Sequence, residues 1–203
     1  MAELVKSFVT LDKDGGSGNG TVTASANSNN TGRNARSVNV TFSAVNCESQ
    51  QRTLIQSGKP ETTAIQSAAA AQKTGQTLTL TGTSNSKKLT FSKGTDNIGL
   101  TLPASYTANG VSTTNGADIT GDPGATAEYN YSIQLTVPAN SDVDPKTCQI
   151  VVTDDAGNDH ICLITLAAGD AYLTVGQPSG NLPWDGSSTV TVAVTSNTSW
   201  TIA

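Results

Sequence analysis

The chain has 203 residues, of which 35% are hydrophobic, 4% are aromatic and 13% are charged, and its net charge is −5. This composition is unusual for an enzyme and predicts several thin β cores instead of one large core, because Thr, Val, Gly and Asn favour strands and the turns between them. It provides no basic stripe for nucleic acid and no apolar run of about 18 residues to span a membrane.

Residues 1–61 predict a β domain. Residues 4–9 contain two short apolar pairs, which form either a strand or an anchoring arm. A Gly-rich turn follows and ends in Asn19-Gly20, the strongest short hairpin signal. Pro60 cannot continue a central strand and marks the end of the domain. Apolar and polar residues alternate in the strands expected at residues 21–26 and 37–45, and residues 51–55 are expected to return as a further strand.

Residues 62–76 are the only helix candidate, because residues 68–71 form the one unbroken alanine run of the chain. An isolated helix this short is marginal in water. The segment is therefore predicted to be either a linker or a short docked helix.

Residues 77–170 predict a second β domain. Its best-defined element is a hairpin whose turn is the DDAGND stretch at residues 154–159. Residues 105–127, rich in Asn, Gly and Asp, are predicted to be a long loop that is functional or mobile. The expected strands are residues 77–81, 88–91, 98–102, 129–137, 147–153 and 161–166.

Residues 171–203 predict the start of a third β domain, with strands at residues 172–175, 189–195 and 199–202. Three strands are too few to close a sandwich. This domain is therefore expected to be incomplete, and the natural protein is expected to continue.

Cysteine usage and the first residues both predict a protein made in a cytoplasm. Cys47, Cys148 and Cys162 are odd in number, so a complete disulfide framework is impossible and three reduced thiols are expected. Cys148 and Cys162 flank one hairpin and can lie near each other in some registers. Residues 1–16 contain no apolar segment of about 7–15 residues, so no export signal is expected.

Few residues are candidates for chemistry. His160 lies beside Asp154, Asp155 and Asp159, which is either a metal or acid–base cluster or ordinary turn polarity. Turn polarity is the preferred interpretation, because no second histidine exists to complete a zinc site. The DKDGG stretch has Thr23 where a calcium loop needs its bidentate glutamate.

Catalytic motifs are missing too. The chain has no Gly-x-Ser-x-Gly, P-loop or His-Glu-x-x-His pattern. Glu48, Glu61 and Glu128 are isolated, so a glycosidase pair has no support. No enzyme activity, cofactor or metal is predicted.

Several stretches resemble a known family. SNTSWTIA, which follows the alternating TVTVAV strand, is similar to the opening of a BACON domain. GTVTASANSNNTGRNARSVNVTFSA, closed by LIQSGKP, is similar to the second half of the same family. The stretches TGTSNSKKLTF and LTVPANSDVDPKTCQIVV resemble another immunoglobulin-like module of the kind found beside BACON domains. The first unit lacks a BACON-type opening half, and the third lacks the closing half.

The resemblance implies an all-β chain of tandem immunoglobulin-like β-sandwiches, as in surface proteins of Bacteroidetes and in the phages that infect them. A crassvirus-type auxiliary capsid or head-fibre protein is expected, on the capsid exterior and without enzyme activity. Its expected partners are the major capsid protein, neighbouring capsid proteins and other copies of itself, with weak glycan contact. The alternative is a carbohydrate-binding or spacer module of a Bacteroidetes cell-surface protein.

Three residues are the candidate binding residues. Arg33 and Arg36 precede the central strand of the first domain, where guanidinium groups can bind capsid carboxylates. The alternative is a solvated loop, or one arginine that covers the sandwich edge with its aliphatic stem. Trp184 lies in the NLPWDG loop and is the better candidate for stacking on a sugar. Trp200 alternates with Ile202 on an expected strand and is predicted to be core.

Overall fold

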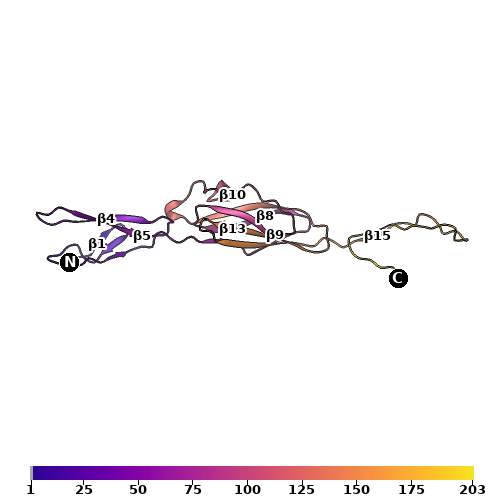
Figure 1. The fold of residues 1–203 in the computed structure, drawn as a ribbon, viewed down its shortest axis with the longest axis horizontal. Coiled ribbons are helices and arrows are strands. Elements are labelled where there is room, and N and C mark those ends of the chain that lie inside the picture. Colours follow the sequence, from indigo (N-terminus) through magenta and orange to yellow (C-terminus); the bar gives the residue numbers. More distant parts are fainter. Residues whose placement is uncertain (1) are drawn as a thin grey trace.

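The computed structural model describes residues 2–203 and is all-β, as predicted. Three parts follow one another along a long, narrow molecule (Figure 1). We call them the N-terminal unit (residues 2–59), the middle unit (residues 60–169) and the C-terminal unit (residues 170–203). Among the described residues the one helical element is the 3-10 turn η1, Gly124–Thr126.

The N-terminal unit consists of a three-stranded antiparallel sheet, in the order β1-β2-β3, and a separate antiparallel hairpin, β4-β5. Its core is small, because only Phe8, Val9, Leu11 and Val40 are buried in it. The strands are β1 (Leu4–Lys6), β2 (Val9–Leu11), β3 (Ala24–Ala26), β4 (Arg36–Phe42) and β5 (Gln50–Gln56).

The middle unit is two sheets packed around one core. One sheet has the order β11-β10-β12-β8-β6 and the other has the order β7-β14-β13-β9. The strands of the first are β6 (Thr63–Ile65), β8 (Gln76–Ser84), β10 (Ser105–Ala108), β11 (Val111–Thr114) and β12 (Tyr129–Val137). Those of the second are β7 (Ala68–Ala71), β9 (Leu89–Asp96), β13 (Lys146–Asp154) and β14 (Asp159–Leu166).

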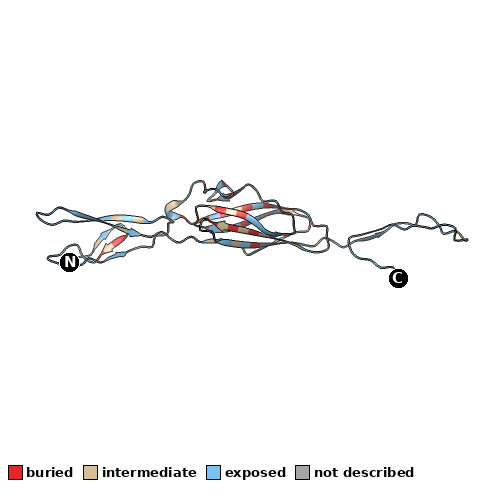
Figure 2. Cartoon of the chain, in the orientation of Figure 1, coloured by how far each residue is buried: buried red, intermediate tan, exposed pale blue. Residues whose placement is uncertain are grey.

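Alternation along the strands builds this core, as the period-2 pattern predicts. In β12 every second side chain is buried, from Tyr129 at 4% exposure to Leu135 at 0%. In the facing sheet Ile150, Val152 and Ile164 are fully buried. Figure 2 shows the buried residues concentrated in the middle unit, with exposed residues dominating both ends.

The C-terminal unit is a two-stranded ribbon of β15 (Leu173–Val175) and β16 (Val194–Ser196). Of its predicted strands, residues 189–195 form a strand only at their end, and residues 199–202 form none. Trp200, predicted to be core, is 47% exposed. A single ribbon has no second layer to bury an indole ring, which accounts for the difference.

The prediction of a linker or short helix at residues 62–76 is wrong. This segment forms β6 and β7, and it belongs to the middle unit. The alanine run is β7, which pairs parallel with β14 from Ala68↔Leu163 to Ala71↔Leu166. Helix propensity is a weak preference that four alanines cannot turn into a stable helix, whereas pairing at the edge of a packed sheet satisfies their backbone groups.

The prediction that residues 105–127 are only a loop is also wrong. They contain the hairpin β10-β11, which turns at Asn109-Gly110 with both residues at positive φ. The Asn-Gly pair is a strong hairpin signal, but its flanking strands are short and rich in Thr and Ser. Conversely, the strand expected at residues 98–102 is reduced to one isolated bridge, Thr101↔Thr136.

The closing halves of the N-terminal and middle units are repeats of each other. Nδ2 of Asn30 donates to the carbonyl oxygens of Asn34 and Ser57, at 2.8 and 3.1 Å. Asn140 makes the same contacts in the middle unit, with Asp144 at 2.8 Å and Ala167 at 3.0 Å. We call the difference in residue number between Asn30 and Asn140 the repeat offset, and two residues separated by this difference are counterparts. The two hairpins are related by the same repeat offset, because their first paired residues are Arg36↔Gln56 in β4-β5 and Lys146↔Leu166 in β13-β14.

We expect Asp96→Asn to destabilise the middle unit by about 1–2 kcal/mol at neutral pH. Burial alone would raise the pKa of Asp96, but bonds from Lys93 Nζ (2.7 Å) and from the N–H groups of Gly99 and Ile98 (both 3.0 Å) outweigh it and lower this pKa below 3.8. The stabilisation is therefore present above the unfolded-state pKa and is lost as pH falls through the folded-state pKa.

Denaturant unfolding of both proteins from pH 7 to pH 2 measures this effect. The difference between them should shrink below about pH 4, and a difference that persists unchanged at pH 2 would contradict the assignment.

Candidate functional site

The candidate site is the open side of the N-terminal unit, where strands present in the middle unit have no counterpart. In the middle unit β13 lies between β14 and β9, whereas its repeat β4 pairs with β5 alone. Likewise β14 is flanked by β7, whereas its repeat β5 has no second neighbour. Among the described residues, the outer edges of β4 and β5 are therefore unpaired.

The missing neighbour leaves an apolar surface uncovered. Phe42 of β4 is 43% exposed, whereas Val152, its counterpart at the repeat offset, is completely buried. Val40 keeps 3% exposure because Phe8, Val9 and Leu11 still cover it from the other layer. The N-terminal unit thus buries Val40 at the centre of its core and exposes Phe42 at the open edge.

A groove of about 490 Å³ follows this open side. Its apolar wall is formed by Leu4, Leu11, Val40 and Phe42, and its opposite wall is the Gly-rich segment at residues 13–22. Consecutive residues of the hairpin, 40–43, line it. Because successive side chains of a strand point to opposite faces, lining by consecutive residues places the groove along the backbone edge of β4.

The Gly-rich segment is a hairpin loop closed by Asp12. Its carboxylate accepts from the backbone N–H of Thr23 at 2.9 Å, and its own N–H donates to the carbonyl of Thr23 at 3.0 Å. The stretch that superficially resembles a calcium loop therefore serves to close the β2-β3 connection. Across residues 2–203, no group of three or more His, Cys, Asp and Glu side chains is placed to hold a metal ion.

Charge is divided unevenly along the molecule. Residues 1–59 carry six Lys and Arg against four Asp and Glu, a net charge of +2. Residues 60–203 carry five against twelve, a net charge of −7. By formal charge the end of the molecule with the open groove is therefore the basic end, but two of its six cations, Arg33 and Lys59, pair with acidic residues of the middle unit.

Arg33 lies at the junction between the N-terminal and middle units. Nη1 donates to the carbonyl of Asn85 at 2.8 Å, and Nη2 forms an ion pair with Asp122. The side chain is 9% exposed. Lys59 Nζ adds an ion pair with Glu128 at 2.9 Å across the same junction. The donors of Arg33 named here are used within the chain, and docking to a capsid by this residue stays a prediction.

Arg36 packs within the N-terminal unit. Its guanidinium lies 4.4 Å from the centre of the Phe8 ring. Nε donates to Gln56 Oε1 at 2.7 Å, and Nη2 donates to the carbonyl of Ser28 at 2.8 Å. This placement fits the predicted alternative that an arginine covers the edge of the sandwich, and capsid docking by Arg36 also stays a prediction.

The junction contacts lead to a prediction about rigidity. In the double variant Arg33→Ala/Lys59→Ala both units should stay folded, but the range of angles between them should widen because two charged links are lost. Small-angle X-ray scattering measures the change as a broadened distance distribution. The variant Arg52→Ala/Lys13→Ala removes the same charge away from the junction and is the control. Identical scattering from both variants would contradict the role of these links.

Trp184 is the most exposed large apolar residue described, at 97% of its surface. It lies in the segment between β15 and β16. The C-terminal unit that contains this segment is at the opposite end of the molecule from the N-terminal unit (Figure 1). An indole this exposed offers both ring faces to solvent, as the glycan prediction requires. That prediction is otherwise untested.

The residues around His160 stabilise the β13-β14 turn. Asp154 accepts from the N–H of Asn158 at 2.8 Å, and Asp159 accepts from the Thr153 hydroxyl at 2.6 Å. His160 Nε2 is 3.8 Å from an Asp154 carboxylate oxygen. These contacts agree with the turn-polarity interpretation.

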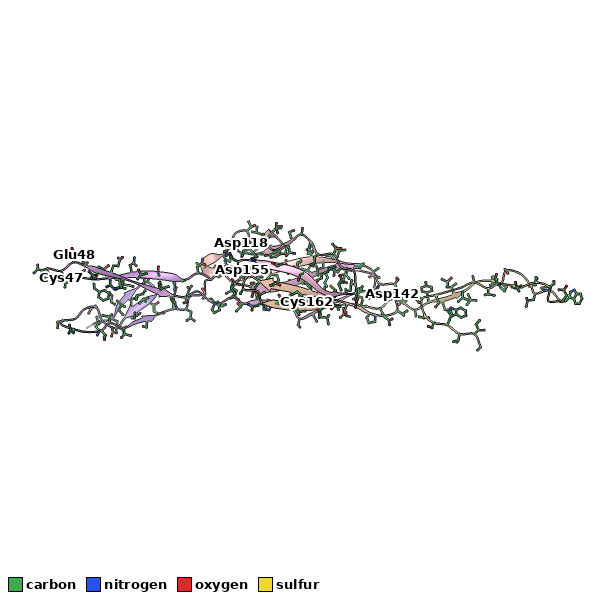
Figure 3. All side chains as sticks on the ribbon, viewed as in Figure 1. Cys47, Glu48, Asp118, Asp142, Asp155 and Cys162 are labelled. Carbon is green, nitrogen blue, oxygen red and sulfur yellow. The ribbon has the colours of Figure 1, made fainter. Side chains whose placement is uncertain are left out.

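The other acidic residues are spread over the molecule. Asp155 pairs with Lys88 at 2.9 Å, and Glu61 accepts from the N–H of Ala156 at 3.2 Å. Glu48 lies at the tip of the β4-β5 hairpin, whereas Asp118 and Asp155 lie at the near end of the middle unit (Figure 3). Glu48, Glu61 and Glu128 therefore do not meet at one place.

All three cysteines are free thiols. Cys47 is exposed at the hairpin tip next to Glu48 (Figure 3). Cys148 and Cys162 are on the adjacent strands β13 and β14, where each pairs with an isoleucine. Burial, with a smaller contribution from Asp96, raises the pKa of Cys148 to about 11, so this residue behaves as a small core side chain.

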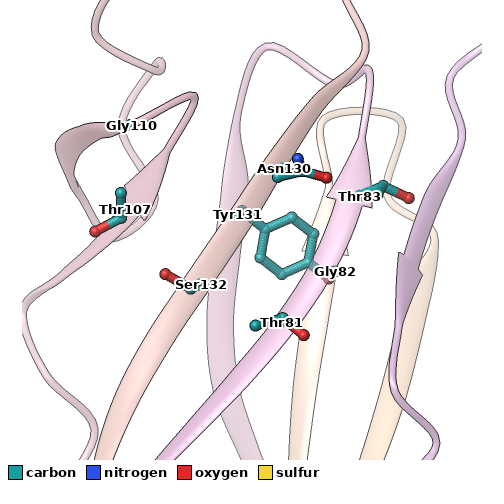
Figure 4. A pocket seen from close by; sticks show the side chains of 8 residues that line it. All are labelled: Thr81, Gly82, Thr83, Thr107, Gly110, Asn130, Tyr131 and Ser132. Carbon is teal, nitrogen blue, oxygen red and sulfur yellow. The ribbon is translucent and has the colours of Figure 1, made fainter.

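A second hollow, of about 400 Å³, lies on the middle unit and has a structural cause. Tyr131 of β12 lies across Gly82 of β8, where any side chain would overlap the phenol ring (Figure 4). The Tyr131 hydroxyl donates to the carbonyl of Ala64 at 2.8 Å. The hollow is thus the space beside a tyrosine that links three strands, with a rim of Thr and Ser.

The described residues define an all-β protein made of serial units, with an open β edge at its basic end. Within residues 2–203 no helix has the length and apolar character needed to cross a bilayer. A scan against protein-family models finds no match, and no curated protein sequence matches the chain.

Proposed function

We propose that this protein is a non-enzymatic structural protein of a bacteriophage virion. It is an auxiliary capsid (decoration) or head-fibre protein, attached to the major capsid protein by its N-terminal unit and displaying immunoglobulin-like β domains outward. The BACON-like stretches suggest a phage of Bacteroidetes. In this proposal the chain is made in the host cytoplasm and assembled onto the capsid exterior.

The observation that carries this proposal is the contrast between the two repeats. The middle unit is a complete, self-contained sandwich, whereas the N-terminal unit has an uncovered edge beside a groove with one apolar wall. A protein that only filled space between other domains would have no use for an open unit at one end. An open unit followed by a closed one suits a protein that attaches at one end and projects at the other.

Two further features support attachment by the N-terminal unit. The Arg33 and Lys59 contacts join it to the middle unit, so a docked N-terminal unit would hold the projecting part in a defined direction. Its six Lys and Arg against four Asp and Glu would also suit an acidic capsid surface better than the remainder of the chain, whose net charge is −7.

Mass spectrometry of purified virions of the phage that encodes the chain tests this proposal. The chain should be present in many copies and should cross-link to the major capsid protein through residues 2–59. Its absence from purified virions would overturn the proposal, and cross-links made only through residues 170–203 would overturn the direction of attachment.

A second candidate function rests on Trp184. Its 97% exposure favours glycan stacking, the property expected of a carbohydrate-binding or spacer module of a cell-surface protein. Glycan-array binding that is lost in Trp184→Ala and kept in Leu182→Ala, a neighbour that is 72% exposed, would support this function.

A further inference from the structure

The repeat shows what kind of element is missing beside β4. Strand β13 bonds antiparallel to β9, with Phe91 opposite Val152 and Leu89 opposite Asp154. Applying the repeat offset places the vacant position opposite Phe42 and the residues next to it. The vacancy is therefore an antiparallel strand position with a known register, and it coincides with the groove along residues 40–43.

The chemistry of the occupant can be inferred from β9. Its inward residues Leu89 and Phe91 are 0% and 2% exposed, whereas Thr90 between them is only partly buried. A strand that fills the same position beside β4 therefore needs two large apolar residues two positions apart. One of them would cover Phe42, which has no such neighbour in the N-terminal unit.

Unlike the other sheet edges, the β4 edge carries no feature that discourages pairing. Edge strands are commonly blunted by charge, proline, bulges or short length. In the middle unit β6, β7 and β11 have three or four residues, and β9 carries Lys93 beside a register shift. Strand β4 has seven residues, and after Arg36 it contains neither charge nor proline. A long, uncharged edge beside a groove with one apolar wall can accept a strand.

Charge bears on the chemistry of the donor. Two of the six Lys and Arg in residues 1–59, Arg33 and Lys59, form ion pairs with acidic residues of the middle unit, and the remaining four balance four Asp and Glu. The lining of the groove likewise contains one cation, Lys13, and one anion, Asp14. A donor strand with no net charge therefore suits this edge.

We propose that the β4 edge is an acceptor site for an extended strand donated by the protein to which the N-terminal unit attaches. The donor strand adds antiparallel to β4, carries two apolar residues at alternate positions with one of them against Phe42, and has no net charge. This inference rests on the proposed function for the identity of the donor, and it adds the mode of attachment.

The test uses the full chain and a synthetic peptide of residues 89–97, LTFSKGTDN, with blocked ends and a net charge of zero from Lys93 and Asp96. Hydrogen exchange followed by mass spectrometry measures amide protection in residues 38–44. Saturating peptide should slow exchange there by about tenfold or more. A peptide carrying Leu89→Ser and Phe91→Ser should give no protection.

Two matched variants of the acceptor locate the binding. Phe42→Glu introduces charge into the groove and should abolish the protection. Ile55→Glu is its control, because Ile55 is 70% exposed and pairs with Ser37 on the outer face of the same hairpin. It should leave peptide binding unchanged. Both sites are exposed, so both variants should fold, which circular dichroism verifies.

Three results would overturn the proposal. One is no protection of residues 38–44 at millimolar peptide. Another is equal protection with the serine-substituted peptide. The last is a stable dimer of the peptide-free chain, seen by light scattering, with these residues already protected, since a second copy would then occupy the edge. No virion is involved, so failure here is distinguishable from absence of the chain from virions.

Discussion

Replacing Ile150 with alanine is expected to lower the free energy of unfolding of the middle unit by about 3–5 kcal/mol. Ile150 is fully buried and lies at the centre of β13, between β14 and β9. Because strands lie on both sides of β13 and a second sheet faces it, the surrounding side chains cannot move in to fill the cavity that alanine would leave. Scanning calorimetry measures the loss as a lower midpoint of the transition that belongs to the middle unit.

The matched variant in the other repeat is Val40→Ala, because Val40 is the counterpart of Ile150 at the repeat offset. It removes less apolar volume from a core that is open on one side, so its cost should be smaller, about 1–2 kcal/mol. The loss should appear in the transition of the N-terminal unit and leave the middle unit unchanged. A single transition lowered equally by both variants would show that the two units do not unfold as separate bodies.

Asn140→Ala is expected to destabilise the middle unit by about 2–4 kcal/mol. The side chain is 4% exposed and bonds three backbone groups: the carbonyls of Asp144 and Ala167 and the N–H of Asp142, the last at 3.1 Å. Alanine would remove all three bonds, including the two that tie the loop before β13 to the end of β14. Chemical denaturation monitored by circular dichroism measures the effect.

Asn130→Ala is the control for this variant, because Asn130 is exposed on β12. It should change the stability by less than about 0.5 kcal/mol. Asn30→Ala, the equivalent change in the N-terminal unit, should lower the stability of that unit alone. An Asn140→Ala protein as stable as Asn130→Ala would contradict the role of the asparagine as the link between the β13 loop and the end of β14.

Where alternation is long, the fold could be predicted from sequence. Strand β12 begins and ends at the predicted residues 129–137, and β13 and β14 differ from prediction only slightly at their ends. The prediction for the alanine run was wrong because the structure of this run depends on β14, which is distant in sequence, as the pair Ala68↔Leu163 shows. Its own residues contain no signal for that parallel pairing.

The family resemblance already indicated that the first unit lacks an opening half. The position of the open edge could not be predicted, because it depends on strand order, which local periodicity does not determine. One signal was nevertheless present. Asn30, Asn34 and Arg36 have the same spacing as Asn140, Asp144 and Lys146, which marks the two closing halves as repeats. The few residues between the end of β3 at Ala26 and the start of this motif at Asn30 leave no room for a further strand directly before the repeated half.

Arg33 and Arg36 illustrate the limit for the candidate binding residues. The sequence alone placed both in a loop and left open whether they dock to carboxylates or cover the edge of the sandwich. Contacts with Asn85 and Asp122 in the next unit, and with Phe8 in the preceding sheet, depend on packing between distant segments. The groove beside β4 contains neither arginine in its lining.

The central claim is that the N-terminal unit is an open version of the middle unit. Native-state hydrogen exchange of the free chain tests it most directly, by comparing residues 38–44 with their repeats at 148–154. Because β4 has one neighbour and a rim exposed to water, its amides should exchange about 100-fold faster or more than those of β13. Equal protection of the two segments would show that the edge is already occupied and would contradict the claim.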